Sequence, residues 1–292
     1  MKIQNIGIMS PGDMGQAVAH QLKLAGFNVY TALDKRSART RTLAKQAGIA
    51  DVGSLHKLAE QCEVILSVMP PGAALEFAGE LAQVLSTTQQ KVLFVDCNAV
   101  APATMKAIAE KITAAGGRCV DAGITGPPPR GTAKTLMWVS GPEATELEQL
   151  ANPLMTVRVL SERIGDASAY KMCYAALSKG TSALVLEVMI AARRLGIDDV
   201  LDAHFKQRFG AGYGEMLDGL PVIPPKAHRF VPEMLEIAST FESVGVTPRS
   251  FQGFADIYGY IATTRLGKET PENCDKSRTG EEVFRLIADE DR

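Results

Sequence analysis

The sequence predicts an α/β fold, a doubly wound and mostly parallel β-sheet over residues 1–163, followed by an all-α domain over residues 164–292. Three observations predict it. In the first half, short apolar runs alternate with helical patterns of about a dozen residues, as in βαβ units. From 166 to 195 there is no proline and one glycine. The length of 292 residues also favours two domains over one.

The apolar runs of the first half predict strands over Ile3–Met9, Asn28–Leu33, Val64–Val68, Lys91–Asp96, Arg118–Asp121 and Leu136–Ser140. The segments between some of them predict helices over Asp13–Ala25, Ser37–Ala47 and Pro102–Ala115. Gly26, Gly48 and Gly116 follow these helices, and glycine readily takes the left-handed conformation that ends a helix.

The second half begins with one long predicted helix, Asp166–Leu195, which would span about 45 Å. It is too apolar around its circumference for a free surface helix, so we expect it to run through a core or an oligomer interface. Further helices are predicted over Val200–Phe209, Pro232–Val244, Pro248–Leu266 and Gly280–Asp289. Packing of these apolar helices between copies predicts a homodimer or a larger homo-oligomer.

Composition excludes several classes of function. The net charge is −2 and the pI about 6.1, so the chain has no overall positive charge. Binding to nucleic acid or to an anionic membrane is therefore not predicted. No apolar run approaches the length of a membrane helix, and the N-terminus does not resemble a signal peptide. Five widely spaced cysteines without a Cys-x-x-Cys pair argue against disulfides and zinc and suit a reducing cytoplasm. No cluster of His, Asp and Glu residues has the spacing of metal ligands, so no metal site is predicted.

The first predicted strand runs into Ser10-Pro11-Gly12-Asp13-Met14-Gly15, where the dinucleotide-binding fingerprint G-x-G-x-x-G is found in other proteins. A serine replaces the first glycine, and the other two are present. The helix N-terminus that follows offers free N–H groups and a partial positive charge to a pyrophosphate. We therefore predict that residues 10–14 bind a dinucleotide, the alternative being a tight strand–helix turn without a ligand.

The end of the second strand should distinguish NAD from NADP. Asp34 could accept a hydrogen bond from a ribose 2′-hydroxyl, which favours NAD. Arg36, Ser37 and Arg39 could bind a 2′-phosphate, which favours NADP, and the basic residues outnumber the acid. NADP is the favoured cofactor and NAD the alternative. The same residues would also fit a solvated basic start of a helix.

Four stretches of this layout resemble the β-hydroxyacid dehydrogenase family, whose members include 3-hydroxyisobutyrate and 6-phosphogluconate dehydrogenases. Ser10–Gly15 matches its G-L-G-x-M-G turn, and Val68-Met69-Pro70 matches a strand end on the nicotinamide side. Asp121–Gly126 matches the substrate motif D-A-P-V-S-G. Gly165–Lys171 matches G-x-G-x-x-x-K, which carries the catalytic lysine. The resemblance implies a Rossmann-like N-terminal domain.

The resemblance also implies roles for individual residues. Lys171 would be the general acid and base, and Thr125 with Gly126 would hold a substrate carboxylate. Asn98 would lie near the nicotinamide ribose, or simply form a turn before the next helix. Tyr174 would orient the substrate, or only pack.

Three departures mark a divergent subgroup whose C-terminal domain has no assigned function. The family's lysine is followed by K-x-x-N-N, whereas this chain has Tyr174 and Ala175 in place of the asparagines. The prolines of 127–129 replace glycines, and a second family lysine has no clear counterpart near 229–235. These departures affect substrate identity more than reaction type.

The leading hypothesis is therefore an NAD(P)-dependent dehydrogenase or reductase of a small, carboxylate-bearing hydroxyacid or its oxo form. One alternative is an oxidative decarboxylase of a hydroxyacid. Imine reductases share the layout but usually lack the lysine, so Lys171 argues against that reaction. From a different class, the chain could be a non-catalytic NADP-binding sensor.

Overall fold

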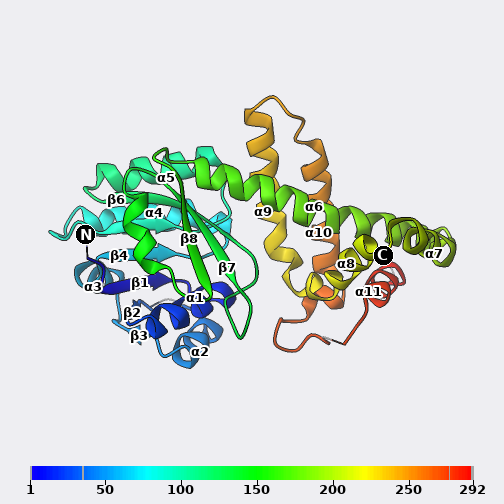
Figure 1. The fold of residues 1–292 in the computed structure, drawn as a ribbon, viewed down its shortest axis with the longest axis horizontal. Helices are drawn as coiled ribbons and strands as arrows, with labels where there is room; N and C mark the ends of the chain where they lie inside the picture. Colours follow the sequence, from blue (N-terminus) through cyan, green and yellow to red (C-terminus); the bar gives the residue numbers. More distant parts are fainter. Residues whose placement is uncertain (1, 35, 276, 291–292) are drawn as a thin grey trace. The chain divides into compact units, whose positions relative to one another are not determined.

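The computed structural model describes residues 2–34, 36–275 and 277–290, which form two compact units, Met1–Met172 and Cys173–Arg292 (Figure 1). The sequence placed the boundary at 163/164. The observed division lies inside helix α6 (Asp166–Arg194) because the first two turns of this helix bond to the sheet of the first unit. Ser168 contacts Asp121 there, and Lys171 contacts Ile124.

In the part of the chain that the structure describes, eight strands form one sheet in the order β3-β2-β1-β4-β5-β6-β7-β8. Neighbours are parallel except β6 and β7, which are antiparallel. The strands are β1 (Asn5–Met9), β2 (Asn28–Thr31), β3 (Ala50–Asp51), β4 (Val64–Ser67), β5 (Leu93–Asp96), β6 (Arg118–Thr125), β7 (Thr135–Ser140) and β8 (Met155–Ser161).

Helices cover both faces of this sheet, which confirms the predicted doubly wound α/β class (Figure 1). One core lies under α1 (Asp13–Leu24), α2 (Ala38–Gln46) and the 3₁₀ helix η2 (Ala144–Leu150). The other lies under α3 (Leu55–Gln61), α4 (Ala74–Leu85) and α5 (Pro102–Ala114), with η1 (Pro71–Ala73) before α4. Alternate residues of each strand enter opposite cores, as the pleat requires: Val64 and Leu66 enter the first and Ile65 the second.

Several elements of the first unit differ from the prediction. The strand predicted to end at Asp121 continues to Thr125, and β7 returns antiparallel to it. Helices α3 and α4 and strands β3 and β8 were not predicted. The predicted ends of three helices agree with the structure, because Gly26, Gly48 and Gly116 have φ of +95°, +65° and +84°.

The second unit is helical, as predicted. After α6 come α7 (Asp198–Phe209), α8 (Ala211–Asp218), η3 (Leu220–Val222), η4 (Pro224–Lys226), α9 (Ala227–Ser243), α10 (Arg249–Thr263), η5 (Leu266–Lys268) and α11 (Gly280–Ala288). The helix predicted to begin at Pro232 begins at Ala227 instead, with the proline inside it. Pro232 lies past the first turn, so it removes the hydrogen bond that a backbone N–H at this position would donate to the His228 carbonyl.

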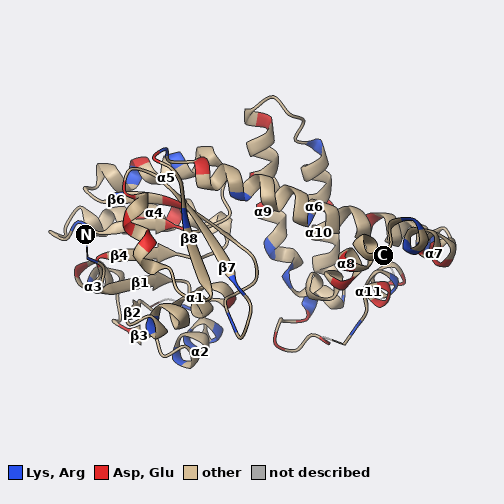
Figure 2. Ribbon diagram, viewed as in Figure 1, with Lys and Arg blue, Asp and Glu red and all other residues tan. Residues whose placement is uncertain are grey.

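Helix α6 is the helix, among the described residues, that is long and apolar enough by composition to cross a membrane. Of its most apolar window, 44% is buried inside the protein. Acidic and basic residues are interspersed over both units (Figure 2).

Candidate functional site

The loop from β1 to α1 makes the tight turn that a dinucleotide requires. Ser10 has φ of +55°, in the left-handed region that glycine adopts most easily. The Gly12 amide donates to the Ser10 carbonyl across 2.6 Å and closes the turn. A Cβ at Gly15 would lie 3.0 Å from the same carbonyl oxygen, so a larger residue there would push the turn and the helix apart. The serine thus keeps the shape of the glycine it replaces, at a cost of about 1–2 kcal/mol.

The N-terminus of α1 is suited to an anion. Gly12 is the N-cap, and no side chain of the described residues caps the helix. Asp13 is the first helical residue. Pro11 is buried and Met14 packs against the core, so both ends of the turn are anchored. Because the first-turn N–H groups carry a partial positive charge, the residues present fit the pyrophosphate of a dinucleotide.

The turn lies at the topological switch point of the sheet, since β1 has β2 on one side and β4 on the other. Open α/β sheets bind their ligands outside the carboxyl ends of the strands at this point. The Val68 amide donates to the Met9 carbonyl across 3.1 Å, so the end of β4 lies beside the turn. Met69 is buried and Pro70 is exposed.

The buried side chain of Asn98 links the ends of β4 and β5 by hydrogen bonds. Its Oδ1 accepts from the Met69 amide at 2.6 Å, and its Nδ2 donates to Ser67 Oγ at 2.9 Å and to Asp96 Oδ2 at 2.8 Å. The side chain is 2% exposed. The sequence allowed two roles for Asn98, a contact with the nicotinamide ribose or a turn before the next helix. These hydrogen bonds within the protein resemble the second role more than the first. Through Met69, Asn98 still sets the backbone next to the nucleotide turn.

The residues after β2 reach the turn from the other side. Arg36 Nη1 donates to Ser10 Oγ at 3.4 Å, so the structure brings these two predicted cofactor residues together. Ser37 caps α2, accepting from the Thr40 amide at 3.2 Å. Arg39 is exposed on the first turn of that helix, and Asp34 is exposed after β2. Position 35 lies outside the described residues.

Lys171 lies at the carboxyl end of β6, beside the predicted substrate motif. Its Nζ donates to the Ile124 carbonyl across 2.7 Å, and the side chain is half-buried. The next residue, Thr125, is buried, and its hydroxyl donates to the Leu136 carbonyl at 3.3 Å. Gly126 has φ of +93° and turns the chain away from the strand. The structure thus brings the lysine, Thr125 and Gly126 together at one strand end.

A buried carboxylate positions the helix that carries the lysine. Asp121 on β6 accepts from the amides of Gly165 and Ser168 at 3.0 and 2.9 Å, and from the Ser168 hydroxyl at 2.7 Å. The Ser140 hydroxyl donates to Asp121 at 3.2 Å and accepts from the Ala167 amide at 2.9 Å. Burial raises the pKa of Asp121, although these hydrogen bonds act in the opposite direction. The first turn of α6 is therefore capped by the sheet itself.

The same helix approaches β6 very closely at Gly123. A Cβ there would lie 2.8 Å from the Ala167 carbonyl oxygen and 3.0 Å from Lys171 Cβ. This position is the proline of the family motif D-A-P-V-S-G, which carries a Cβ. The glycine therefore lets the lysine-bearing helix lie against the strand at this point.

A contact that the sequence did not predict joins the two halves of the site. Arg130, in the loop 126–134 between β6 and β7, donates from Nη2 to the Asp13 carbonyl at 2.6 Å and to Asp13 Oδ1 at 2.7 Å. The loop that follows the substrate motif thus reaches the first residue of the nucleotide-binding helix. A lone arginine after three prolines carries no sequence signal for such a contact.

Tyr174 belongs to the second unit and is 45% exposed. Cys97 is buried, and its burial raises the pKa of the thiol well above the usual value. In the described part of the chain, no group of three or more His, Cys, Asp or Glu residues could hold a metal ion.

Comparison with known families assigns both halves of the chain. The NAD binding domain of 6-phosphogluconate dehydrogenase matches residues 5–158, more than half of the chain. A domain of unknown function (DUF1932) matches residues 192–261.

Two curated relatives are 3-hydroxyisobutyrate dehydrogenases. The chain is 26% identical to the one from Pseudomonas aeruginosa, over 76% of each chain. It is 24% identical to the mitochondrial enzyme from Drosophila melanogaster, over 71% of this chain but 60% of the fly protein.

Solved structures share the fold over nearly the whole chain. A conserved protein of unknown function, MTH1747, described as similar to 3-hydroxyacid dehydrogenases, is 28% identical with a TM-score of 0.64, over 90% of this chain and 98% of that one. The Mycobacterium tuberculosis 3-hydroxyisobutyrate dehydrogenase with L-serine has a TM-score of 0.68 at 16% identity, over 98% of both chains. An imine reductase from Myxococcus stipitatus with NAD⁺ has a TM-score of 0.56 at 19% identity, over 98% of this chain and all of that one.

The strand–turn–helix geometry at Ser10–Gly15, the switch point beside it and the matched residues 5–158 agree with one another. The chain belongs to the β-hydroxyacid dehydrogenase family, with an NAD-binding domain like that of 6-phosphogluconate dehydrogenase and a divergent helical C-terminal domain.

Proposed function

We propose that the protein is an NAD(P)-dependent oxidoreductase that transfers hydride between a nicotinamide and a small hydroxyacid or its oxo form. One observation carries this proposal. Lys171 donates to the Ile124 carbonyl at the carboxyl end of β6, next to Thr125 and Gly126, where the family's substrate motif lies. An ammonium group held at this strand end can exchange a proton with a substrate oxygen.

A bound nicotinamide supplies or accepts the hydride. In reduction of an oxo acid, the Lys171 ammonium donates its proton to the carbonyl oxygen, which becomes the hydroxyl. In oxidation the neutral lysine takes that hydroxyl proton. Thr125 and Gly126 hold the substrate carboxylate, and the Ile124 carbonyl keeps the ammonium at the strand end.

NADP is the proposed cofactor. Arg36, Ser37 and Arg39 follow β2, where the 2′-phosphate of NADP would lie, and guanidinium groups bind phosphate strongly. The hydrogen bond from Arg36 to Ser10 supports this assignment, because it puts one cation beside the nucleotide turn. Asp34 would take the corresponding role with NAD.

Two other functions fit parts of the same site. Oxidation could be followed by decarboxylation, and loss of the family's two asparagines at Tyr174 and Ala175 would suit a non-catalytic NADP sensor. Imine reductases share the fold, but Lys171 favours a substrate that exchanges a proton on oxygen.

The test begins with a fluorescence titration of the purified full-length protein with NADPH and with NADH. The cofactor that binds is then used with a panel of small 2-oxo and 3-oxo acids and a cyclic imine. We expect NADPH to bind more tightly and an oxo acid to be reduced.

The Lys171→Ala variant should bind NADPH as the unchanged protein does and lose turnover by about a hundredfold or more, which is the size of a general acid contribution. Lys111→Ala, which removes an exposed lysine from α5, is the matched control. Full turnover in Lys171→Ala would exclude the catalytic assignment. Binding without any turnover would favour the sensor.

We further propose that the protein forms a homodimer or a larger homo-oligomer through its helical unit, in a reducing cytoplasm. Large apolar side chains are exposed there, and association of copies would bury them. They include Leu177, Leu195, Val200 and Phe209, which are 76%, 74%, 77% and 57% exposed. Light scattering at micromolar concentration should give at least twice the chain mass of 31.2 kDa, and a strict monomer would exclude this assembly.

A further inference from the structure

We propose that Arg130 binds the pyrophosphate of the dinucleotide, and that on cofactor binding it exchanges the Asp13 carboxylate for the phosphate oxygens. The inference rests on the proposed function, because it requires that a nicotinamide dinucleotide occupies the turn at Ser10–Gly15. It assigns a cofactor contact to the loop after the substrate motif.

The position of the guanidinium is the first argument. Asp13 directly follows the N-cap Gly12, so a group bonded to both its carbonyl and its carboxylate lies beside the first turn of α1. The first-turn amides and the helix dipole favour an anion at the adjacent end of the helix. Arg130 adds a full positive charge to a place that already favours phosphate.

The hydrogen bonding of Arg130 is the second argument. Both of its bonds to Asp13 use Nη2. Among the described residues, its Nε and Nη1 have no hydrogen-bond partner, and the side chain is 46% exposed. A guanidinium group presents its donors as a planar fork that matches two phosphate oxygens. The group is therefore held near the turn with donors left for a ligand.

The third argument concerns Asp13. An exposed ion pair is weak, so the carboxylate can give up Arg130 at little cost. A pyrophosphate carries more negative charge and accepts bidentate bonds, so it competes well for the same guanidinium. The displaced carboxylate remains at a helix N-terminus, where a negative charge is favourable. Asp13 thus keeps the arginine in place until the phosphates arrive.

The loop itself is held in shape, which lowers the entropy cost of using it. Pro127, Pro128 and Pro129 fix three φ angles directly before Arg130. The Thr135 hydroxyl donates to the Pro127 carbonyl, and the Ala133 amide donates to the Arg130 carbonyl at 2.9 Å. The prolines that replace the family's glycines would thus stiffen the segment that presents the arginine.

The pyrophosphate is common to NADPH and NADH, so a contact with it can be distinguished from a contact with the 2′-phosphate, which only NADPH carries. Arg130→Ala should raise the Kd for both cofactors by the same factor, about tenfold, as expected for loss of a charge-assisted hydrogen bond. Arg36→Ala should raise the Kd for NADPH alone. Arg163→Ala, which removes an arginine side chain that is 82% exposed in the same unit, should change neither.

Two simpler ligands locate the contact. Arg130→Ala should weaken the binding of ADP-ribose, which contains the pyrophosphate. It should leave the binding of adenosine 2′-monophosphate unchanged, because that ligand lacks the pyrophosphate.

Two further variants test the exchange between Asp13 and the phosphates. Asp13→Asn should tighten the binding of both dinucleotides by removing the competing charge. Arg130→Lys should restore part of the affinity, since lysine keeps the charge but loses the fork. Matching thermal unfolding curves would show that the variants are folded.

Several results would overturn the inference. An unchanged Kd in Arg130→Ala would leave the arginine as a partner of Asp13 only. A loss confined to NADPH would assign it to the 2′-phosphate, and tighter binding would mean that the pair blocks the turn. If the unchanged protein binds neither cofactor, the proposed function itself fails. That outcome is distinct, because it is seen before any variant is made.

Discussion

The junction of β6 with α6 and the ion-pair network around α7 both attach a helix to its surroundings, but with different chemistry. At the junction one carboxylate, Asp121, is fully buried and accepts four hydrogen bonds from the start of α6 and from Ser140. Its partners are neutral amides and hydroxyls. Such short bonds in a dry environment fix the helix in one position.

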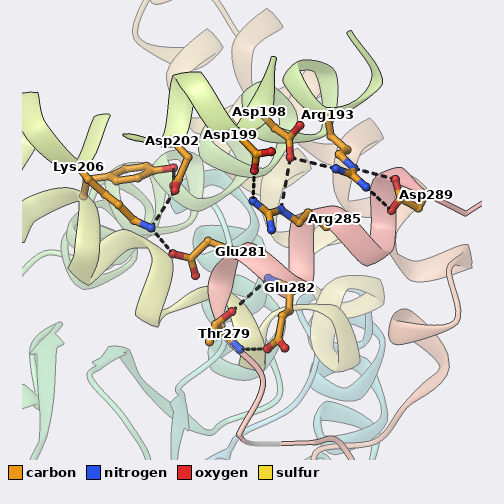
Figure 3. A network of polar contacts seen from close by, with 11 residues as sticks. Arg193, Asp198, Asp199, Asp202, Lys206, Thr279, Glu281, Glu282, Arg285 and Asp289 are labelled. Carbon is orange, nitrogen blue, oxygen red and sulfur yellow. Dashed lines mark hydrogen bonds and ion pairs between the residues drawn. The ribbon is translucent and has the colours of Figure 1, made fainter. Parts of the chain in front are cut away.

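In the helical unit the corresponding contacts are ion pairs between partly exposed basic side chains and acidic ones, of which Asp198 and Asp202 are buried (Figure 3). Arg193 at the end of α6 contacts Asp198 and Asp289 at 3.4 and 3.0 Å. Arg285 on α11 contacts Asp198 at 3.3 Å and Asp199 at 2.6 Å. A second set joins Lys206 to Asp202 and Glu281 at 2.8 and 2.7 Å. Thr279 and Glu282 form a capping box at the start of α11.

The difference shows where precision is needed. The helix that carries Lys171 is positioned by buried bonds, which would suit the proton transfer proposed for this lysine. The network of the helical unit shares its charges among several partners, so losing one pair leaves others in place. Breaking the buried bonds of Asp121 should therefore cost more than breaking one exposed pair of the network, such as Arg193 with Asp289.

The largest effect is expected for Asp121→Ala. The change leaves the buried amides of Gly165 and Ser168 without acceptors, so we expect a loss of about 3–5 kcal/mol in the free energy of unfolding. Urea denaturation of both proteins measures it. Asp166→Ala is the matched control on the same helix turn, because its carboxylate bonds to Ser161 and Arg163 near the surface. A larger loss in the control would contradict the comparison.

A smaller effect is expected for Gly123→Ala. The added methyl would meet the Ala167 carbonyl at 2.8 Å, so the helix must shift, at a cost of about 1–3 kcal/mol. Gly79→Ala serves as the control, because a Cβ there meets nothing within 4 Å and alanine favours a helix such as α4, by about 0.5–1 kcal/mol. Thermal unfolding should shift in opposite directions for the two variants. Two shifts of the same sign would refute the close approach.

The smallest effect is expected in the ion-pair network, and it depends on pH. The hydrogen bond from Arg193 lowers the pKa of Asp289 below its ordinary value of 3.8. This pair therefore stabilises the folded state above that value, and the contribution is lost as the pH falls through the lowered pKa.

Arg193→Ala should accordingly unfold slightly more easily than the unchanged protein at pH 7, with the difference shrinking below pH 4 and in high salt. Thermal unfolding of both proteins between pH 7 and pH 3 measures it. A difference that grows on acidification would show that the sign is wrong.

The sequence predicted the parts of the fold that local signals determine. Glycine marked the ends of α1, α2 and α5, and the turn at Ser10–Gly15 was found because its strand and helix are adjacent in the chain. The antiparallel return of β7 and the extension of β6 to Thr125 were not predicted, because strand pairing depends on contacts that are distant in sequence. The start of α9 was misplaced because proline usually marks a first turn.

The candidate site shows the same limit. Lys171 was found through a motif, but the contacts that position it were not, because Asp121 meets Gly165 and Ser168 only after α6 packs on the sheet. Arg130 and Asp13 are equally distant in the chain, and no pattern of residue types joins them. Motifs therefore reveal which residues belong to the candidate site, whereas tertiary packing determines which contacts position them.

The antiparallel pairing of β6 with β7 has a consequence for how this fold can diversify. Thr125 pairs with Leu136, so the segment 126–134 leaves and re-enters the sheet at neighbouring points. Its length can therefore change without altering the register of any strand. Insertions or deletions in this one segment are therefore an inexpensive route by which related chains could acquire different ligand preferences on an unchanged sheet.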